Sequence, residues 1–322
     1  MALNKAGSDQ ILRVTDLCKR YGKTEVLSQL ALSVNKAAIH GLVGLNGSGK
    51  TTTLECLLGL QSFDSGTIEL LNLAPHELYK AQGRIVGIFD SPSLNPSLTV
   101  RQTLVHATLL CTRPVRSPAE LEDLLGISRY RNYRINQLSL GNRRRASIAQ
   151  ALVGRPELVI LDEPFNGLDA GGVEDVLALI SRLNQEEGTT FLLSSHQLPY
   201  LEHICSHLAI LHQGRIVLNK AVTDLFAANQ LVLCIRCTET DRAMRLLQSA
   251  TGVDQLTLLA DGQLRMQLTD TRPEKLNALL VQAGIAVSEL RPEQASLTSL
   301  FHELTGTATA PEHQRDDREA AA

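Results

Sequence analysis

Short apolar runs alternate with glycine-rich turns and helical stretches through the first two-thirds of the chain. Residues 11–17 and 30–34 alternate apolar and polar positions on either side of the turn-like segment RYGKTE, which predicts a pair of antiparallel strands. The runs 39–44, 158–161 and 190–193 are almost entirely apolar, as is typical of parallel strands buried on both faces. This mixture predicts an α/β domain around a parallel sheet.

Helical spacing follows the first buried run and returns further along the chain. Residues 51–60 (TTTLECLLGL) have the spacing of a helix that starts directly after a glycine loop. Prolines 96, 114 and 118 interrupt a stretch rich in helix formers, so a mainly helical insertion is expected at about 92–150. Residues 209–218 predict a hairpin that turns at Gln213-Gly214.

The pattern changes after about residue 230. Alternating strands are expected at 231–237, 253–268 and 285–291, with helical patterns at 241–249 and 272–283. We therefore expect a first domain at 1–230, a small α+β domain at 231–306 and a disordered tail at 307–322, where apolar anchors are missing.

Composition narrows the classes of partner. The chain has 31 basic and 34 acidic residues, and its aromatic residues are six Phe, five Tyr and no Trp. A nucleic-acid surface would need basic excess and stacking aromatics, so no nucleic-acid partner is expected. No run approaches the ~18 uncharged apolar residues of a membrane span, and the first ten residues lack the apolar core of a signal peptide.

The six cysteines are expected to be reduced thiols of a cytosolic protein. Cys234 and Cys237 form a C-x-x-C, but they lie in the predicted strand LVLCIRC. Residues three apart on a strand point to opposite faces, so we expect two packed thiols there and no metal site.

A phosphate-binding loop stands between the first buried strand and the helix after it. Residues 44–51, GLNGSGKT, match G-x-x-x-x-G-K-[ST]. The glycines let backbone amides turn toward a polyphosphate, Lys50 reaches the β- and γ-phosphates, and the Thr51 hydroxyl ligates Mg²⁺. The residues expected to hold the nucleotide here are Gly44, Leu45, Asn46, Gly47, Ser48, Gly49, Lys50, Thr51 and Thr52.

A second buried strand ends in two carboxylates. Residues 158–163, LVILDE, fit a Walker B element, in which a rigid strand end holds Asp162 near the magnesium ion. Glu163 can then orient or deprotonate the water that attacks the γ-phosphate. Without the upstream loop, the pair could also be an exposed acidic cap of the next segment.

The segment Leu138-Ser139-Leu140-Gly141-Asn142 precedes three arginines and a predicted helix. Here the sequence resembles the ATP-binding-cassette (ABC) ATPases, whose signature LSGGQ stands about twenty residues before Walker B. The resemblance covers about 11–227 and implies a P-loop NTPase cassette, with a RecA-like core, an antiparallel β subdomain and the helical insertion. It also implies that Ser139 and Gly141 of one subunit close over the γ-phosphate held by another. Leu140 and Asn142 depart from the family's usual Gly and Gln.

The same resemblance assigns three further residues. His196 matches the family's switch histidine, which hydrogen-bonds the γ-phosphate and maintains the attacking geometry. Asp169, in the stretch NGLD, resembles the D-loop residue that addresses the opposite subunit. Tyr21 resembles the aromatic residue that stacks on adenine, although an isolated Tyr is more often a packing residue.

Asp90 is the clearest departure, because the family normally places Gln there to sense Mg²⁺ or the attacking water. The carboxylate is shorter and charged, so a water-bridged contact to Mg²⁺ is more plausible than direct ligation. We hypothesise that Asp90 still couples nucleotide state to the helical insertion. An acidic residue in this loop is similar to bacitracin- and lantibiotic-immunity exporter ATPases.

The end of the second domain, VSELRPEQASLTSLFHELTG, resembles the accessory domain of bacterial drug, lantibiotic and polysaccharide-type exporter ATPases. A generic amphipathic helix explains its apolar positions almost as well.

The resemblance implies a Mg²⁺-dependent ATPase subunit of an ABC transporter, most plausibly an exporter. Because one cassette holds half of each composite site, two copies (or a paired second cassette) would sandwich ATP and drive a separate membrane permease from the cytoplasmic face. Two alternatives stay open: a non-transport ABC ATPase and a catalytically weak regulatory subunit. A translation regulator would normally carry two cassettes, and a DNA-repair or chromosome-organising ATPase long heptad repeats; the chain shows neither pattern.

Overall fold

The computed structural model describes residues 9–90, 94–227, 231–259, 261–269, 271–293 and 297–305. The predicted tail at 307–322 lies outside these ranges. Contacts divide the chain into two compact units, Met1–Val222 and Thr223–Ala322, a division earlier in the chain than the boundary expected from the pattern change. Each unit is described by itself.

A three-stranded antiparallel sheet begins the first unit, in the order β2-β1-β4. β1 (Gln10–Tyr21) pairs with β2 (Thr24–Asn35) and with β4 (Ser65–Leu70). The inward positions of the alternating pattern, such as Val14 and Leu32, are buried and lie opposite each other. The predicted antiparallel pair is confirmed.

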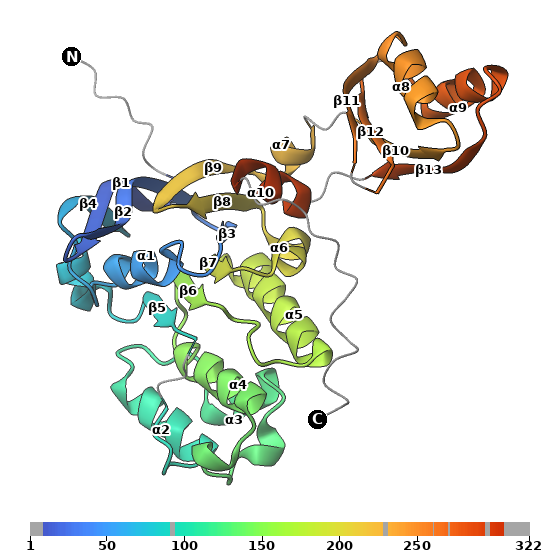
Figure 1. Ribbon diagram of the computed structural model, residues 1–322. Coiled ribbons are helices and arrows are strands. Elements are labelled where there is room, and N and C mark those ends of the chain that lie inside the picture. The colour runs from blue at the N-terminus through green and yellow to red at the C-terminus, as the bar shows by residue number, and fades with distance from the viewer. Residues whose placement is uncertain are drawn as a thin grey trace, which may run out of the picture. The chain divides into compact units, whose positions relative to one another are not determined.

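The six-stranded sheet has the order β5-β6-β7-β3-β8-β9 (Figure 1). All of its pairings are parallel except the hairpin of β8 with β9, which confirms the predicted turn at Gln213-Gly214. Its strands are β3 (Ile39–Val43), β5 (Ile85–Ile88), β6 (Leu158–Asp162), β7 (Thr190–Ser195), β8 (His207–His212) and β9 (Arg215–Ala221). Every residue of β3, β6 and β7 is buried, as predicted for runs without alternation.

This strand order positions the site. Because β3, β6 and β7 are adjacent and parallel, the segments after Val43, Asp162 and Ser195 leave the sheet at one edge. Ligands of open α/β sheets bind at such carboxyl edges. The three expected motifs, far apart in sequence, therefore meet there.

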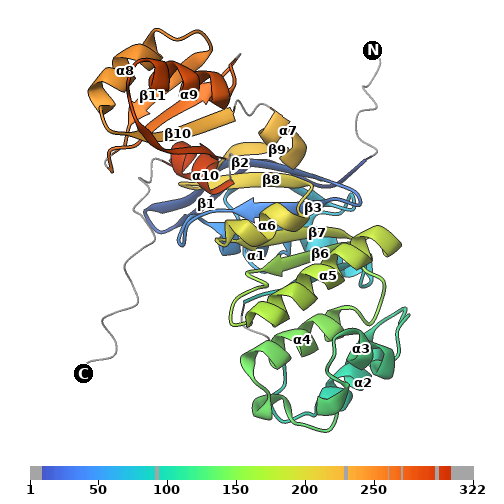
Figure 2. The same ribbon diagram turned by 90° about the vertical axis from the view of Figure 1, so that its right-hand side faces the viewer.

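Helices surround the sheet and form the insertion (Figure 2). The insertion comprises α2 (Val100–Leu110), α3 (Pro118–Leu124) and α4 (Leu140–Ala151), with two 3₁₀ turns, Ser128–Tyr130 and Ile135–Gln137. α2 and α3 each start with a capping box, Thr99 with Gln102 and Ser117 with Glu120. The remaining helices of this unit are α1 (Lys50–Leu57), the 3₁₀ helix Pro75–Ala81, α5 (Ala170–Glu187) and α6 (Leu198–Ile204).

The second unit contains a four-stranded antiparallel sheet in the order β11-β12-β10-β13. Apolar residues of β10 and β12 form its core with α8 and α9. Its elements are α7 (Val222–Ala227, which starts at the division), β10 (Leu231–Cys237), α8 (Thr240–Gln248), β11 (Val253–Leu258), β12 (Leu264–Leu268), α9 (Pro273–Gln282), β13 (Val287–Glu293) and α10 (Leu297–Thr305).

Cys234 and Cys237 both lie on β10, as expected, and none of the six cysteines, all of which the structure describes, forms a disulfide. In the part of the chain that the structure describes, no helix is long and apolar enough to cross a membrane.

Candidate nucleotide site

The loop between β3 and α1 has a conformation that requires glycine. Gly49, the N-cap of α1, has φ +107°, in the left-handed region that L side chains rarely adopt. A Cβ there would lie 2.8 Å from Leu27 Cδ2 and 3.2 Å from the Val26 carbonyl oxygen. The loop thus turns tightly against β2 and directs the N-terminus of α1 at the pocket, a position where backbone amides attract anions.

Lys50 is buried, with 6% of its side chain exposed. Its ammonium donates to the carbonyl oxygens of Gly44 (2.8 Å) and Leu45 (3.3 Å), which belong to the loop itself. Nζ also lies 3.3 Å from Glu163 Oε1. The loop carbonyls and the Glu163 carboxylate thus hold the Lys50 ammonium at the pocket, and a bound phosphate would take over some of these contacts.

Thr51 and Asp162 join the loop to the end of β6. The Thr51 hydroxyl donates to Asp162 Oδ2 at 2.9 Å, and Asp162 Oδ1 accepts from the Ser194 hydroxyl of β7. Asp162 is 3% exposed. The first turn of α1 and the neighbouring strand β7 therefore fix this carboxylate in one orientation.

Glu163 has a left-handed backbone with φ +47°, which costs a non-glycine residue about 1 kcal/mol or more. Its amide donates to the Ser194 carbonyl oxygen at 3.0 Å, and this bond holds the turn. The carboxylate lies between two side chains: the Lys50 ammonium contacts Oε1, and His196 Nδ1 is 3.0 Å from Oε2. The strained turn aims Glu163 into the pocket instead of along the strand.

These side chains line a pocket of about 410 Å³. Asp162, Glu163 and His196 reach it from the sheet edge, and Asp90 reaches it from the loop after β5. The lining residues are Val26, Asn46, Gly47, Gly49, Lys50, Thr51, Thr52, Asp90, Asp162, Glu163, Asn166 and His196. Val26, Asn166 and the supporting Ser194 were not among the residues predicted for the site.

Six predicted residues do not line this pocket: Gly44, Leu45 and Ser48 of the loop itself, and Tyr21, Ser139 and Gly141. Tyr21 is at the β1–β2 turn, 46% exposed, with Lys19 Nζ 4.9 Å from its ring centroid, and does not line the pocket. Ser139 caps α4 by accepting from the Asn142 amide at 3.4 Å, and Gly141 follows it. Neither Ser139 nor Gly141 lines the pocket of its own chain.

The donor set suits Mg²⁺, because a hydroxyl and carboxylates are the hard oxygen ligands that this ion prefers. Thr51 and Asp162 already face each other. Among the described residues, no three His, Cys, Asp or Glu side chains form a metal-binding group of their own. Phosphate and water oxygens would therefore complete the coordination, as is usual for magnesium in nucleotide sites.

Comparison with known proteins gives matches over most of the chain. Residues 27–166 match the family model described as "ABC transporter". The chain is 32% identical over 301 residues to the bacitracin transport ATP-binding protein BcrA of Bacillus licheniformis, covering 93% of this chain and 98% of that protein. It is 31% identical over 301 residues to the methionine import ATP-binding protein MetN of Rhizobium johnstonii, covering 87% and 83%. The solved ATP-binding subunit of an ABC transporter superposes with a TM-score of 0.61 and 26% identity, covering 67% of this chain and 92% of that one.

Proposed function

The chain belongs to the family of ABC transporter ATP-binding proteins and is an ATP-hydrolysing subunit of that family. On this basis we propose which of its residues bind ATP and which hydrolyse it. Lys50 binds the β- and γ-phosphates, Thr51 and Asp162 hold Mg²⁺, and Glu163 activates the attacking water. The remaining loop residues, Gly44 to Gly49 and Thr52, surround the phosphates with backbone amides.

One observation carries this assignment: a single carboxylate, Glu163, contacts both Lys50 and His196 inside the pocket. A water placed against Glu163 is therefore next to the cation that binds the γ-phosphate and the imidazole that can hydrogen-bond it. As the water oxygen bonds to the γ-phosphorus, Glu163 accepts a proton of that water, and the bond from this phosphorus to the β,γ-bridging oxygen breaks, which releases ADP and phosphate. His196 maintains the geometry. When bound, Mg²⁺ neutralises the charge of the phosphate oxygens.

Asp90 contributes to Mg²⁺ binding through a water molecule that bridges its carboxylate and the ion. Its Oδ1 already accepts from Arg144 and Asn166, so the side chain is oriented but partly occupied. Tyr21 stacks on adenine in the bound state, from its exposed position at the β1–β2 turn.

A second copy of the chain completes each site. Ser139 and Gly141 stand at the N-terminus of α4, with Ser139 exposed and both outside the pocket of their own chain. Backbone amides at a helix start bind anions, so the signature of one copy can close over the γ-phosphate on another. ATP binding would close this dimer and hydrolysis would reopen it.

The dimer drives a separate integral-membrane permease, which places the subunit on the cytoplasmic face of the membrane. We assign it to export. The match to BcrA extends over 98% of that protein, and the acidic Asp90 resembles the residue that bacitracin- and lantibiotic-immunity exporter ATPases carry in this loop. The cargo is recognised by the permease, since this subunit presents its pocket to nucleotide.

Glu163→Gln tests the assignment, with Glu174→Gln on the exposed side of α5 as the matched control. Glu163→Gln should bind ATP, accumulate as a dimer in gel filtration and hydrolyse ATP at least about a hundredfold more slowly. Glu174→Gln should hydrolyse ATP at the parental rate and should not accumulate as a dimer. Unchanged turnover in Glu163→Gln would contradict the role given to this carboxylate.

A further inference from the structure

Arg144 of α4 runs underneath the pocket and contacts the two segments that carry its acidic residues. Its side chain is 2% exposed. Nη2 donates to Asp90 Oδ1 at 2.8 Å, and Nη1 lies 3.4 Å from the Phe89 carbonyl oxygen and 3.5 Å from that of Asp162. One buried guanidinium therefore joins the helix that follows the signature to the ends of β5 and β6.

Asp90 extends this connection further along the loop after β6 and, through Asn166, to the loop after β7. Asn166 Nδ2 donates to the same Oδ1 at 3.3 Å, and Gln197 Nε2 donates to Asn166 Oδ1 at 3.3 Å. Gln197 directly follows His196. The loops after β5, β6 and β7 are thus connected through Asp90 and Asn166, and one N–H of the Arg144 guanidinium joins Asp90 to α4.

The charge of the pocket explains why a cation is needed there. Asp90, Asp162 and Glu163 all line it, and Lys50 is the single Lys or Arg in its described lining. The ligand is a polyanion, so an uncompensated third carboxylate would repel it. The Asp90 side chain lines the pocket and is 53% exposed, whereas its partner Arg144 is 2% exposed.

We propose that Arg144 is a positioning residue for nucleotide binding: it offsets the Asp90 charge and holds that carboxylate in place, so that the pocket can bind a polyanion beside a third acidic side chain. This inference rests on the function proposed above. It assigns no contact between Arg144 and the nucleotide, because the arginine acts through Asp90.

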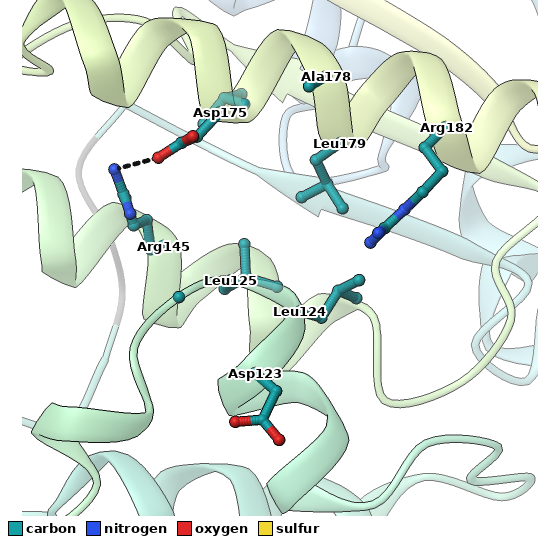
Figure 3. Close-up of a pocket in the computed structure, with 10 residues that line it drawn as sticks. Asp123, Leu124, Leu125, Arg145, Asp175, Ala178, Leu179 and Arg182 are labelled. Carbon is teal, nitrogen blue, oxygen red and sulfur yellow. Dashed lines mark hydrogen bonds and ion pairs between the residues drawn. The ribbon is translucent and has the colours of Figure 1, made fainter.

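The neighbouring Arg145 provides the control, because it contacts a different part of the molecule. Its Nη2 is 2.9 Å from Asp175 Oδ2 of α5, at the side of a separate pocket of about 310 Å³ (Figure 3). Leu124, Leu125 and Leu179 line that pocket. Asp175 is 67% exposed, so Asp175→Asn removes an arginine ion pair from α4 without touching the nucleotide pocket.

ATP affinity, measured by titration calorimetry on the full chain with Mg²⁺ and again with EDTA, tests the inference. Arg144→Gln should bind ATP about tenfold more weakly or worse, mainly as a higher KM in steady-state hydrolysis. The double variant Asp90→Asn/Arg144→Gln removes both charges and should return to within about threefold of the parent. The affinity of Asp175→Asn for ATP should stay within about twofold of the parent's.

Arg144→Lys keeps the positive charge, so its affinity for ATP should stay within about threefold of the parent's. This variant provides a test even if Arg144→Gln does not fold. Thermal melting identifies the folded variants. The inference is overturned if Arg144→Gln binds like the parent, if the double variant stays as weak as Arg144→Gln, or if Arg144→Lys loses tenfold.

Failure of this inference is distinguishable from failure of the proposed function. Lys50→Gln in the same titration should lose ATP binding whether or not Arg144 matters. Normal binding by Lys50→Gln would contradict the proposed function, whereas a Lys50 effect without an Arg144 effect would contradict only the inference.

Discussion

The Lys50 ammonium lies 3.3 Å from the Glu163 carboxylate, and both side chains are almost completely buried. The cation proposed to bind phosphate and the carboxylate proposed to activate water are thus paired with each other in this structure. Nucleotide binding has to replace part of this contact, because the same ammonium is proposed to bind phosphate. Breaking one partner of such a buried pair leaves the other uncompensated.

The first prediction follows from this pair. Lys50→Gln should weaken ATP binding at least about tenfold, because the phosphates lose a buried cation while Glu163 remains negative. Calorimetric titration measures the loss. Lys23→Gln, at the exposed β1–β2 turn, is the control and should bind normally; equal affinities in the two variants would disprove the role of Lys50.

The second prediction concerns Gly49. Gly49→Ala should destabilise the first unit by about 1–3 kcal/mol, because φ is +107° and the new Cβ would meet Leu27. Urea unfolding measures this free energy. Gly171→Ala on α5, where a Cβ would meet nothing within 4 Å, should be neutral or stabilise by up to about 1 kcal/mol. A Gly49→Ala variant as stable as the parent would contradict the described loop geometry.

The third prediction is a pH dependence from His40 on β3. Burial, and secondarily the nearby His207, lowers the pKa of His40 to about 3, and neither ring nitrogen has a hydrogen-bond partner among the described residues. The unfolded chain binds a proton at about pH 6.5, and the folded one only near pH 3. The stabilising contribution of neutral His40 is therefore present above pH 6.5 and declines as the pH falls toward 3.

Between pH 7 and pH 5 this histidine should remove about 2 kcal/mol of the free energy of unfolding. Urea unfolding of the parent and of His40→Leu at both pH values measures the effect. His40→Leu should lose about 2 kcal/mol less than the parent over this interval. Equal pH dependence in both proteins would show that His40 titrates normally.

The fold and the grouping of most of the candidate site residues were largely predictable from local patterns. Unbroken apolar runs identified β3, β6 and β7, and the loop sequence 44–51 predicts a phosphate site because glycine, lysine and threonine each have a separate physical task there. The carboxylates of Asp162 and Glu163 could be interpreted as a Walker B element because they stand at the end of a buried strand. These features depend on residues close together in sequence.

The contacts between motifs were not predictable in the same way. That Ser194 binds Asp162 depends on β7 pairing with β6 in one register, which neither strand's own pattern specifies. Arg144 was one of three adjacent arginines, and only the direction of α4 distinguishes it from Arg145. Tyr21 was singled out by its distance before the loop, and in this structure it does not line the pocket.

The central claim is that each nucleotide is held by Lys50 of one copy and Ser139 of another. A mixing experiment tests it most directly: Lys50→Ala and Ser139→Ala should each be inactive alone, whereas a heterodimer of the two would contain one site with both residues intact. On equimolar mixing we predict that ATP hydrolysis recovers to about a quarter of the parental rate, since half of the dimers carry one intact site. A mixture no more active than the two variants measured separately would contradict the account.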